Sequence, residues 1–162
     1  MAGDRLNNIK FKNLTVENIA GRGIAVSGSN ITIENCIIRN IGSTGINIAG
    51  GNAETLRVSG NVVKNNHIHN IGYHTKAYAP AIQIIGIGNV VENNSIHDTT
   101  HGSVFINGGE NKFRNNAIYN SSTMFRDMGS IYVNTGDKPY ERNNEIINNY
   151  IKGYAFTAAS GK

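Results

Sequence analysis

The stretch "VVENNSIHDTTHGSVFING", residues 90–108, combines paired asparagines, alternating apolar residues and a run of turn-forming residues. Its central phrase, "NNSIHD" from Asn93, recurs along the chain with an apolar residue three positions after the first asparagine. The shortest distance between successive copies is 22 residues, and the longer distances are this period plus inserted loops. The other copies are "NLTVEN" from Asn13, "NCIIRN" from Asn35, "NNHIHN" from Asn65, "NNAIYN" from Asn115 and "NNYIKG" from Asn148.

Apolar residues keep fixed positions within each copy. A second apolar pair follows each turn, as in Ile82/Ile84 and Val104/Ile106, and the spacing of two is the period of a strand. Each unit is therefore about three short strands joined by tight turns. Such a unit cannot bury its own apolar face, but stacked units can, since like residues then lie over like residues. The residues three after the aligned asparagines, expected to point inward, are Val16, Ile38, Ile68, Ile96, Ile118 and Ile151.

The composition supports the same fold. The chain has 23 Ile but only 3 Leu, together with 26 Asn and 19 Gly. β-branched residues favour strands, and Asn and Gly tolerate turns with positive φ. The scarcity of Leu argues against a leucine-rich repeat of similar period, and a β-propeller would need a longer period.

We therefore predict an all-β fold, a right-handed parallel β-helix solenoid of about six coils, since parallel crossovers are almost always right-handed. It forms a single domain, residues 1–162, with coils beginning near residues 9, 31, 61, 89, 111 and 144. An asparagine at the same turn of each coil is expected to bond to the asparagines above and below it.

Three segments carry a resemblance to a known group. Residues 21–52, "GRGIAVSGSNITIENCIIRNIGSTGINIAGGN", and residues 88–98, "GNVVENNSIHD", resemble the right-handed parallel β-helix repeat proteins of the pectin-lyase-like superfamily. Residues 124–137, "MFRDMGSIYVNTGD", resemble the Asp-x-Gly-[Ala/Ser]-Ile-Tyr segment of many carbohydrate-active β-helix enzymes.

The resemblance also sets expectations about the ends of the chain. Members of that group are usually longer and have a capping helix, whereas this sequence shows no amphipathic helix to cap either end. We expect a fragment or an uncapped solenoid whose exposed strand edges drive end-to-end association of copies. A parent enzyme would be extracellular or periplasmic, although the chain shows no signal-peptide pattern.

Two insertions at the same turn, residues 73–80 and 121–129, flank the short fourth coil and predict a groove beside coils three to five. Asp127 falls in an insertion rather than in a repeat column, so packing of the solenoid does not account for it. The residues expected to act in catalysis are Asp127, His97, Arg126 and Tyr132, and those expected to bind substrate are His69, Lys76, Gln83, Asp98 and His101.

The preferred function is that of a polysaccharide lyase or a glycoside hydrolase, or a piece of one. It would act on an extended polysaccharide, and the net charge allows an acidic one. A lyase needs a base, a cation and an acid, and His97 or Lys76, Arg126 and Tyr132 suit these roles. A hydrolase needs two carboxylates, which would be Asp127 and, as the nearest candidate, Asp98.

A structural interpretation competes with each of these roles. Asp98 stands in the column of Asn18, Asn40, Asn70 and Asn120, which favours a turn role over catalysis. For His69 and His97, a role as surface or ladder residues of the repeat is favoured over a functional one. The alternative for the whole chain is a non-catalytic scaffold or a self-assembling fragment.

Composition also excludes several classes of partner. The net charge is +4, but the charges are scattered without a Lys/Arg block, which argues against nucleic acid. No segment is long and apolar enough to predict a membrane span. A single cysteine, Cys36, precludes an internal disulfide. No metal or cofactor is expected: the sequence has no Cys cluster or His-x-x-x-His helix, and no acid-rich loop supports Ca²⁺.

Overall fold

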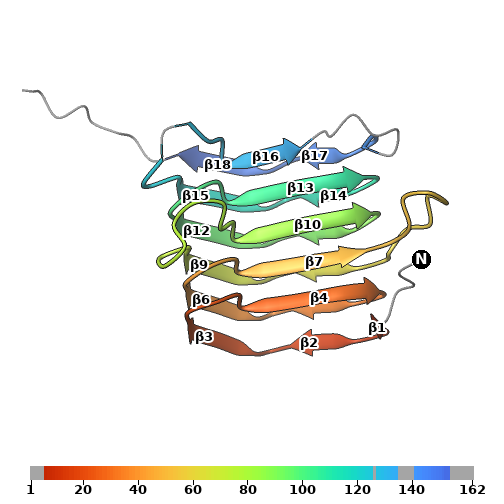
Figure 1. Ribbon diagram of the computed structural model, residues 1–162, viewed down its shortest axis with the longest axis horizontal. Helices are drawn as coiled ribbons and strands as arrows, with labels where there is room; N and C mark the ends of the chain where they lie inside the picture. The colour runs from red at the N-terminus through yellow and green to blue at the C-terminus, as the bar shows by residue number, and fades with distance from the viewer. Residues whose placement is uncertain (1–5, 126, 135–140, 154–162) are drawn as a thin grey trace, which may run out of the picture.

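A computed structural model describes residues 6–125, 127–134 and 141–153, and every regular element in these residues is a strand. The strands form three parallel sheets that stack coil upon coil (Figure 1). Sheet 1 contains β1 (Leu6–Asn7), β4 (Ile24–Ser29), β7 (Ile46–Gly50), β10 (Ile82–Ile87), β13 (Val104–Gly109) and β16 (Ile131–Asn134). Sheet 2 contains β2 (Lys10–Lys12), β5 (Thr32–Glu34), β8 (Val62–Lys64), β11 (Val90–Glu92), β14 (Lys112–Arg114) and β17 (Glu145–Ile147). Sheet 3 contains β3 (Thr15–Ile19), β6 (Ile37–Ile41), β9 (His67–Ile71), β12 (Ser95–Thr99), β15 (Ala117–Ser121) and β18 (Tyr150–Gly153).

The core follows the predicted inward column. Ile38, Ile68, Ile96 and Ile118 are directly paired from β6 to β15 and are completely buried. The residues on either side of each point outward, because successive side chains of a strand face opposite sides of the sheet. This confirms the parallel β-helix and the inward register of these four isoleucines.

The turn between sheet 2 and sheet 3, here called the Asn corner, has two residues in every coil. Its first residue adopts a left-handed conformation with φ between 54° and 57°, in each case an asparagine, which tolerates this region better than most residues. These six residues, the ones aligned in the sequence, are Asn13, Asn35, Asn65, Asn93, Asn115 and Asn148.

The ladder at the Asn corner is made by the second residue of the turn, one position later than the sequence alignment predicts. The side chains of Asn66, Asn94 and Asn116 are buried, whereas the first asparagine of each turn is exposed. Asn66 Nδ2 donates to Asn94 Oδ1 at 2.9 Å, and Asn94 Nδ2 donates to Asn116 Oδ1 at 2.9 Å. The predicted ladder is confirmed from Asn66 to Asn149 but not in the first two coils, where Leu14 and Cys36 occupy this position. The first asparagine of the turn does not form it, because its side chain points into solvent.

A second buried ladder stands at the corner between sheet 1 and sheet 2. There Asn61 Nδ2 donates to Asn89 Oδ1 at 3.1 Å, and Asn89 Nδ2 donates to Asn111 Oδ1 at 2.9 Å. Both ladders also hold backbone groups of neighbouring coils, so their buried amides are satisfied.

The turn from sheet 3 back to sheet 1, here called the loop corner, varies in length. It is a short turn of four residues at 42–45 and at 100–103, and a longer loop at 72–81 and at 122–130. The two long loops lie on the same side of the stack in Figure 1, on either side of the short turn 100–103, as the insertions predicted.

A third insertion, residues 51–61, lies at the corner between sheet 1 and sheet 2, on the opposite side of the stack in Figure 1. It accounts for the 30-residue step between Asn35 and Asn65, so the extra residues of that step are not at the loop corner.

Within the described residues, no helix is long and apolar enough to cross a membrane.

Candidate functional site

The outward face of β10, β13 and β16 carries an open hollow of about 230 Å³ between the two long loops. Its floor comes from two outward columns of sheet 1, in which Gln83, Phe105 and Tyr132 are paired in register and Asn107 is paired with Asn134. Tyr78 contributes one wall from the first loop and Met128 the other wall from the second. The full lining is Tyr78, Gln83, Phe105, Asn107, Met128, Tyr132 and Asn134.

The chemistry of this lining is aromatic and amide in character. The rings of Phe105 and Tyr132 lie 5.8 Å apart, and Tyr132 is 46 % exposed. Side-chain amides both donate and accept hydrogen bonds, and aromatic faces provide flat apolar surface. None of the residues that line the hollow is charged. The hollow therefore suits a neutral, hydroxyl-rich ligand with apolar faces.

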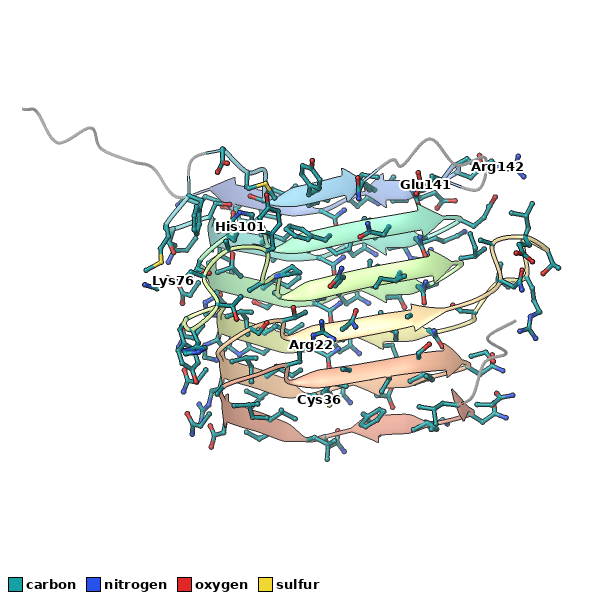
Figure 2. All side chains as sticks on the ribbon, viewed as in Figure 1. Arg22, Cys36, Lys76, His101, Glu141 and Arg142 are labelled. Atoms are coloured by element: carbon teal, nitrogen blue, oxygen red, sulfur yellow. The ribbon has the colours of Figure 1, made fainter. Side chains whose placement is uncertain are left out.

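His101, in the short turn 100–103, lies where the two loops meet and is 3 % exposed. Its ring centroid is 5.0 Å from that of Tyr78 in the first loop and 4.8 Å from that of Phe125 in the second. Figure 2 shows Lys76 at the outer edge of the first loop and His101 closer to the stack. Burial lowers the pKa of His101, while the charge of Asp127 opposes this shift. His101 therefore packs between the loops as a neutral ring, with Asp127 close enough to affect its charge.

Gly102 lets the second loop approach the fourth coil closely. A Cβ at this position would lie 2.8 Å from the Phe105 ring and 2.9 Å from the carbonyl oxygen of Gly129, closer than real Cβ contacts come. The absence of a side chain here therefore helps to position the loop that contains Met128.

A separate cluster lies on the outward face of sheet 3. His69, His97 and Tyr119 are paired in register on β9, β12 and β15. The rings of His69 and His97 are 4.8 Å apart and 6° from parallel, and those of His97 and Tyr119 are 4.5 Å apart and 11° from parallel. His97 Nδ1 lies 2.7 Å from the Asp98 carboxylate.

Asp98 takes the place of an asparagine in the turn column that it shares with Asn70 and Asn120. Its φ is 54°, and its carboxylate accepts a hydrogen bond from the Asn120 side chain. Burial alone would raise the pKa of Asp98, but the hydrogen bonds from Asn120 and His97 outweigh it and lower the pKa. Asp98 is therefore an ionised turn residue that also orients His97.

A comparison with protein-family models places the chain in context. The family described as "Right handed beta helix region" matches residues 3–82. Together with the three parallel sheets, this match determines the fold. The chain is a right-handed parallel β-helix. The family match agrees with the resemblance to the pectin-lyase-like superfamily. Comparisons with curated proteins and with solved structures gave no match.

The β-helix divides the predicted site residues into two groups. Gln83 and Tyr132 line the hollow on sheet 1, and His101 and Asp127 lie at its loop corner. His69, His97 and Asp98 lie on sheet 3 instead, so the prediction that they share one groove with Tyr132 was wrong. The reason is that the loop corner intervenes between β12 and β13 and turns the chain onto another sheet.

Two further predicted residues need separate mention. Lys76 is exposed, with a φ of 63°, and its backbone carbonyl accepts a hydrogen bond from Thr100 Oγ1 at 2.7 Å. It does not line the hollow. Arg126 lies outside the described residues.

Several residues that line the hollow were not predicted from the sequence. Asn107 and Asn134 stand two positions after Phe105 and Tyr132, so continuing the alternation by one step would have placed them on the same outward face. No repeat pattern indicates that Met128 lines the same hollow as Tyr78, since both belong to loops without a period.

Proposed function

We propose that this β-helix binds an extended polysaccharide along the outward face of β10, β13 and β16. The observation that carries the proposal is the hollow between the two loops, with its aromatic and amide lining. Aromatic faces suit the apolar faces of sugar rings, and amides suit hydroxyl groups. A neutral polymer is favoured over an acidic one, because no described cation lines the hollow to bind a carboxylate.

The catalytic part of the proposal concerns Tyr132, which lines the hollow, and Asp127, which lies in the loop beside it. Asp127 is the carboxylate whose charge reaches His101, and Tyr132 exposes its hydroxyl-bearing ring. A hydrolase needs two carboxylates, and Asp98 is unsuited as the second because it is held in the turn column on sheet 3. Elimination requires a uronate beside the proton that is removed, so Asp127 as base and Tyr132 as acid would act as a lyase only on a polymer that carries uronic-acid residues.

A non-catalytic, sugar-binding or structural β-helix is the second candidate. It is favoured by the same lining, which provides contacts for a glycan but no carboxylate pair. The two candidates share the binding surface and differ in whether a product appears.

Binding is tested with neutral polymers such as xylan and β-glucan and acidic polymers such as polygalacturonate, using affinity electrophoresis and calorimetry. Tyr132→Ala should weaken binding at least tenfold, which is about 1.4 kcal/mol. Tyr150→Ala is the matched control, because Tyr150 is 59 % exposed but lies on β18 of sheet 3. Equal losses in both variants, or binding of acidic polymers alone, would contradict the proposed neutral-sugar surface.

Turnover is followed by ultraviolet absorbance of unsaturated uronates for elimination and by reducing ends for hydrolysis. Asp127→Asn should abolish any turnover while leaving the melting temperature within a few degrees, because Asp127 is exposed and Asn retains its shape. Unchanged turnover would remove Asp127 from the mechanism. Binding without any product would establish the non-catalytic candidate.

A further inference from the structure

The histidines of sheet 3 form a site that the proposed polysaccharide surface does not use. His67 and His69 lie two residues apart on the outward side of β9, and His97 lies on the same face of β12. The three ring centroids are 4.6, 4.8 and 4.9 Å apart. His67 reaches diagonally across the strands, so that its Nε2 lies 2.7 Å from His97 Nε2.

The tautomer of His97 follows from its partners. A carboxylate accepts hydrogen bonds, so the 2.7 Å contact between Asp98 and His97 Nδ1 places a hydrogen on that nitrogen. In the neutral ring, His97 Nε2 then carries a lone pair directed at His67. Histidine metal ligands usually donate the hydrogen of their other ring nitrogen to a carboxylate or carbonyl, which fixes the tautomer and the direction of the ring.

The two rings differ in how firmly they are held. His97 is packed between His69 and Tyr119, with its side chain 14 % exposed, so its Nε2 has a fixed direction. His67 is exposed and free to adjust. The neutral imidazole of His67 can therefore turn its Nε2 toward an ion held beside His97.

We propose that His67 Nε2 and His97 Nε2 bind a divalent transition-metal ion of the Cu²⁺, Ni²⁺ or Zn²⁺ type. Imidazole suits these ions, with metal–nitrogen bonds of about 2.0–2.1 Å that place two tetrahedral ligands about 3.3 Å apart. The nitrogens must separate by about half an ångström, which the exposed His67 allows. The His67 proton moves from Nε2 to Nδ1 as the ion binds, so neither ring loses a proton to solvent.

The site has two protein ligands, and water completes the coordination. Within the described residues, no three His, Cys, Asp or Glu side chains form a group that would hold a metal ion together. His69 contributes by stacking on His97 rather than by ligation. Hard ions such as Mg²⁺ and Ca²⁺ prefer oxygen ligands and should not bind here.

The proposal is tested with tag-free protein titrated with Zn²⁺ by calorimetry, and with Cu²⁺ by electron paramagnetic resonance. We expect one ion per chain and a Cu²⁺ spectrum that shows two nitrogen ligands. His67→Gln should weaken binding at least tenfold while retaining the fold, as judged by circular dichroism. His74→Gln is the matched control, because His74 is exposed in the loop 72–81 rather than on sheet 3, and this variant should bind the ion as the parent does.

Three results would overturn the metal site. They are binding by the parent no tighter than by His67→Gln, equal losses in His67→Gln and His74→Gln, and a Cu²⁺ spectrum with a single nitrogen ligand. Because the assays use the metal alone, they are independent of whether the hollow on sheet 1 binds polysaccharide.

Discussion

The Asn corner and the loop corner belong to the same coils but follow different rules. At the Asn corner the turn has two residues in all six coils, and buried amides bond from coil to coil. At the loop corner the connection ranges from the four residues 100–103 to the long loop 72–81, and the loops meet on the ring of His101. The Asn corner thus keeps one length in every coil, whereas the loop corner changes its length from coil to coil. The stack is therefore stabilised at the Asn corner, and the candidate binding surface lies at the loop corner.

The largest loss of stability is expected from a charge placed in the core on which both corners depend. Ile96→Asp places a charge in a completely buried position between Ile68 and Ile118. Burying an unpaired charge costs several kcal/mol, comparable with the whole stability of a typical domain of about 5–15 kcal/mol. The variant should be unfolded by circular dichroism. Ser95→Asp, on the outward side of the same strand, should remain folded; a folded Ile96→Asp would refute the inward register.

The next largest effect should appear at the Asn corner. Asn94 Nδ2 donates to the carbonyl oxygens of Val63 and Glu92, and Asn94 Oδ1 accepts from the backbone amide of Asn66. Asn94→Ala leaves these buried groups unsatisfied, at about 1–3 kcal/mol each, so the free energy of unfolding should fall by at least about 3 kcal/mol. The measurement is urea denaturation.

The control for the ladder is the residue beside it. Asn93 has a φ of 57° and an exposed side chain, and glycine adopts this conformation readily. Asn93→Gly should change stability by less than about 1 kcal/mol. Equal losses from Asn94→Ala and Asn93→Gly would mean that the ladder does not stabilise the corner.

The difference between the corners also explains what could be predicted from the sequence. Ile38, Ile68, Ile96 and Ile118 recur at a fixed place in the repeat, so their burial follows from strand alternation. The stacking of His69 on His97 follows from the same register. These predictions succeed because each coil repeats the geometry of the one before.

What the sequence did not predict lies where repetition fails. His67 is in register with Ser95, so its contact with His97 depends on the direction of one side chain rather than on the repeat. The approach of Tyr78 and Phe125 to His101 depends on loop conformations that have no counterpart in other coils. The hydrogen bonds made at the loop corner likewise differ from one loop to the next.

A smaller, pH-dependent effect is expected at the loop corner. Burial lowers the pKa of His101 in the folded chain below its unfolded value of about 6.5. The unfolded chain then binds more protons, so stability is complete above about pH 6.5 and is lost as the pH falls toward the folded pKa. Melting temperatures between pH 7.5 and pH 5 should fall less in His101→Gln than in the parent. An identical fall in both would show that His101 does not contribute.

The smallest effect on the coils themselves concerns association through their ends. In the last coil the inward residues Ile146 and Ile151 are 39 % and 48 % exposed, whereas Phe113 and Ile118 in the coil before are completely buried. These exposed apolar side chains are the reason to predict end-to-end association of copies. Sedimentation velocity should show a size that rises with concentration, and Ile151→Lys should reduce that rise. A single species of constant size in the parent would contradict it.

The most direct measurement exchanges one loop and leaves the ladder untouched. Residues 72–81 are replaced by the four-residue turn "GSTG" of residues 42–45, which lies one coil away at the same corner. If the Asn corner stabilises the stack and the loop corner carries the binding surface, thermal unfolding should stay cooperative, with the melting temperature within a few degrees of the parent. Polysaccharide binding should be lost at the same time, because Tyr78 is removed from the hollow. Loss of cooperative unfolding, or full retention of binding by the folded exchange, would contradict this division between the two corners.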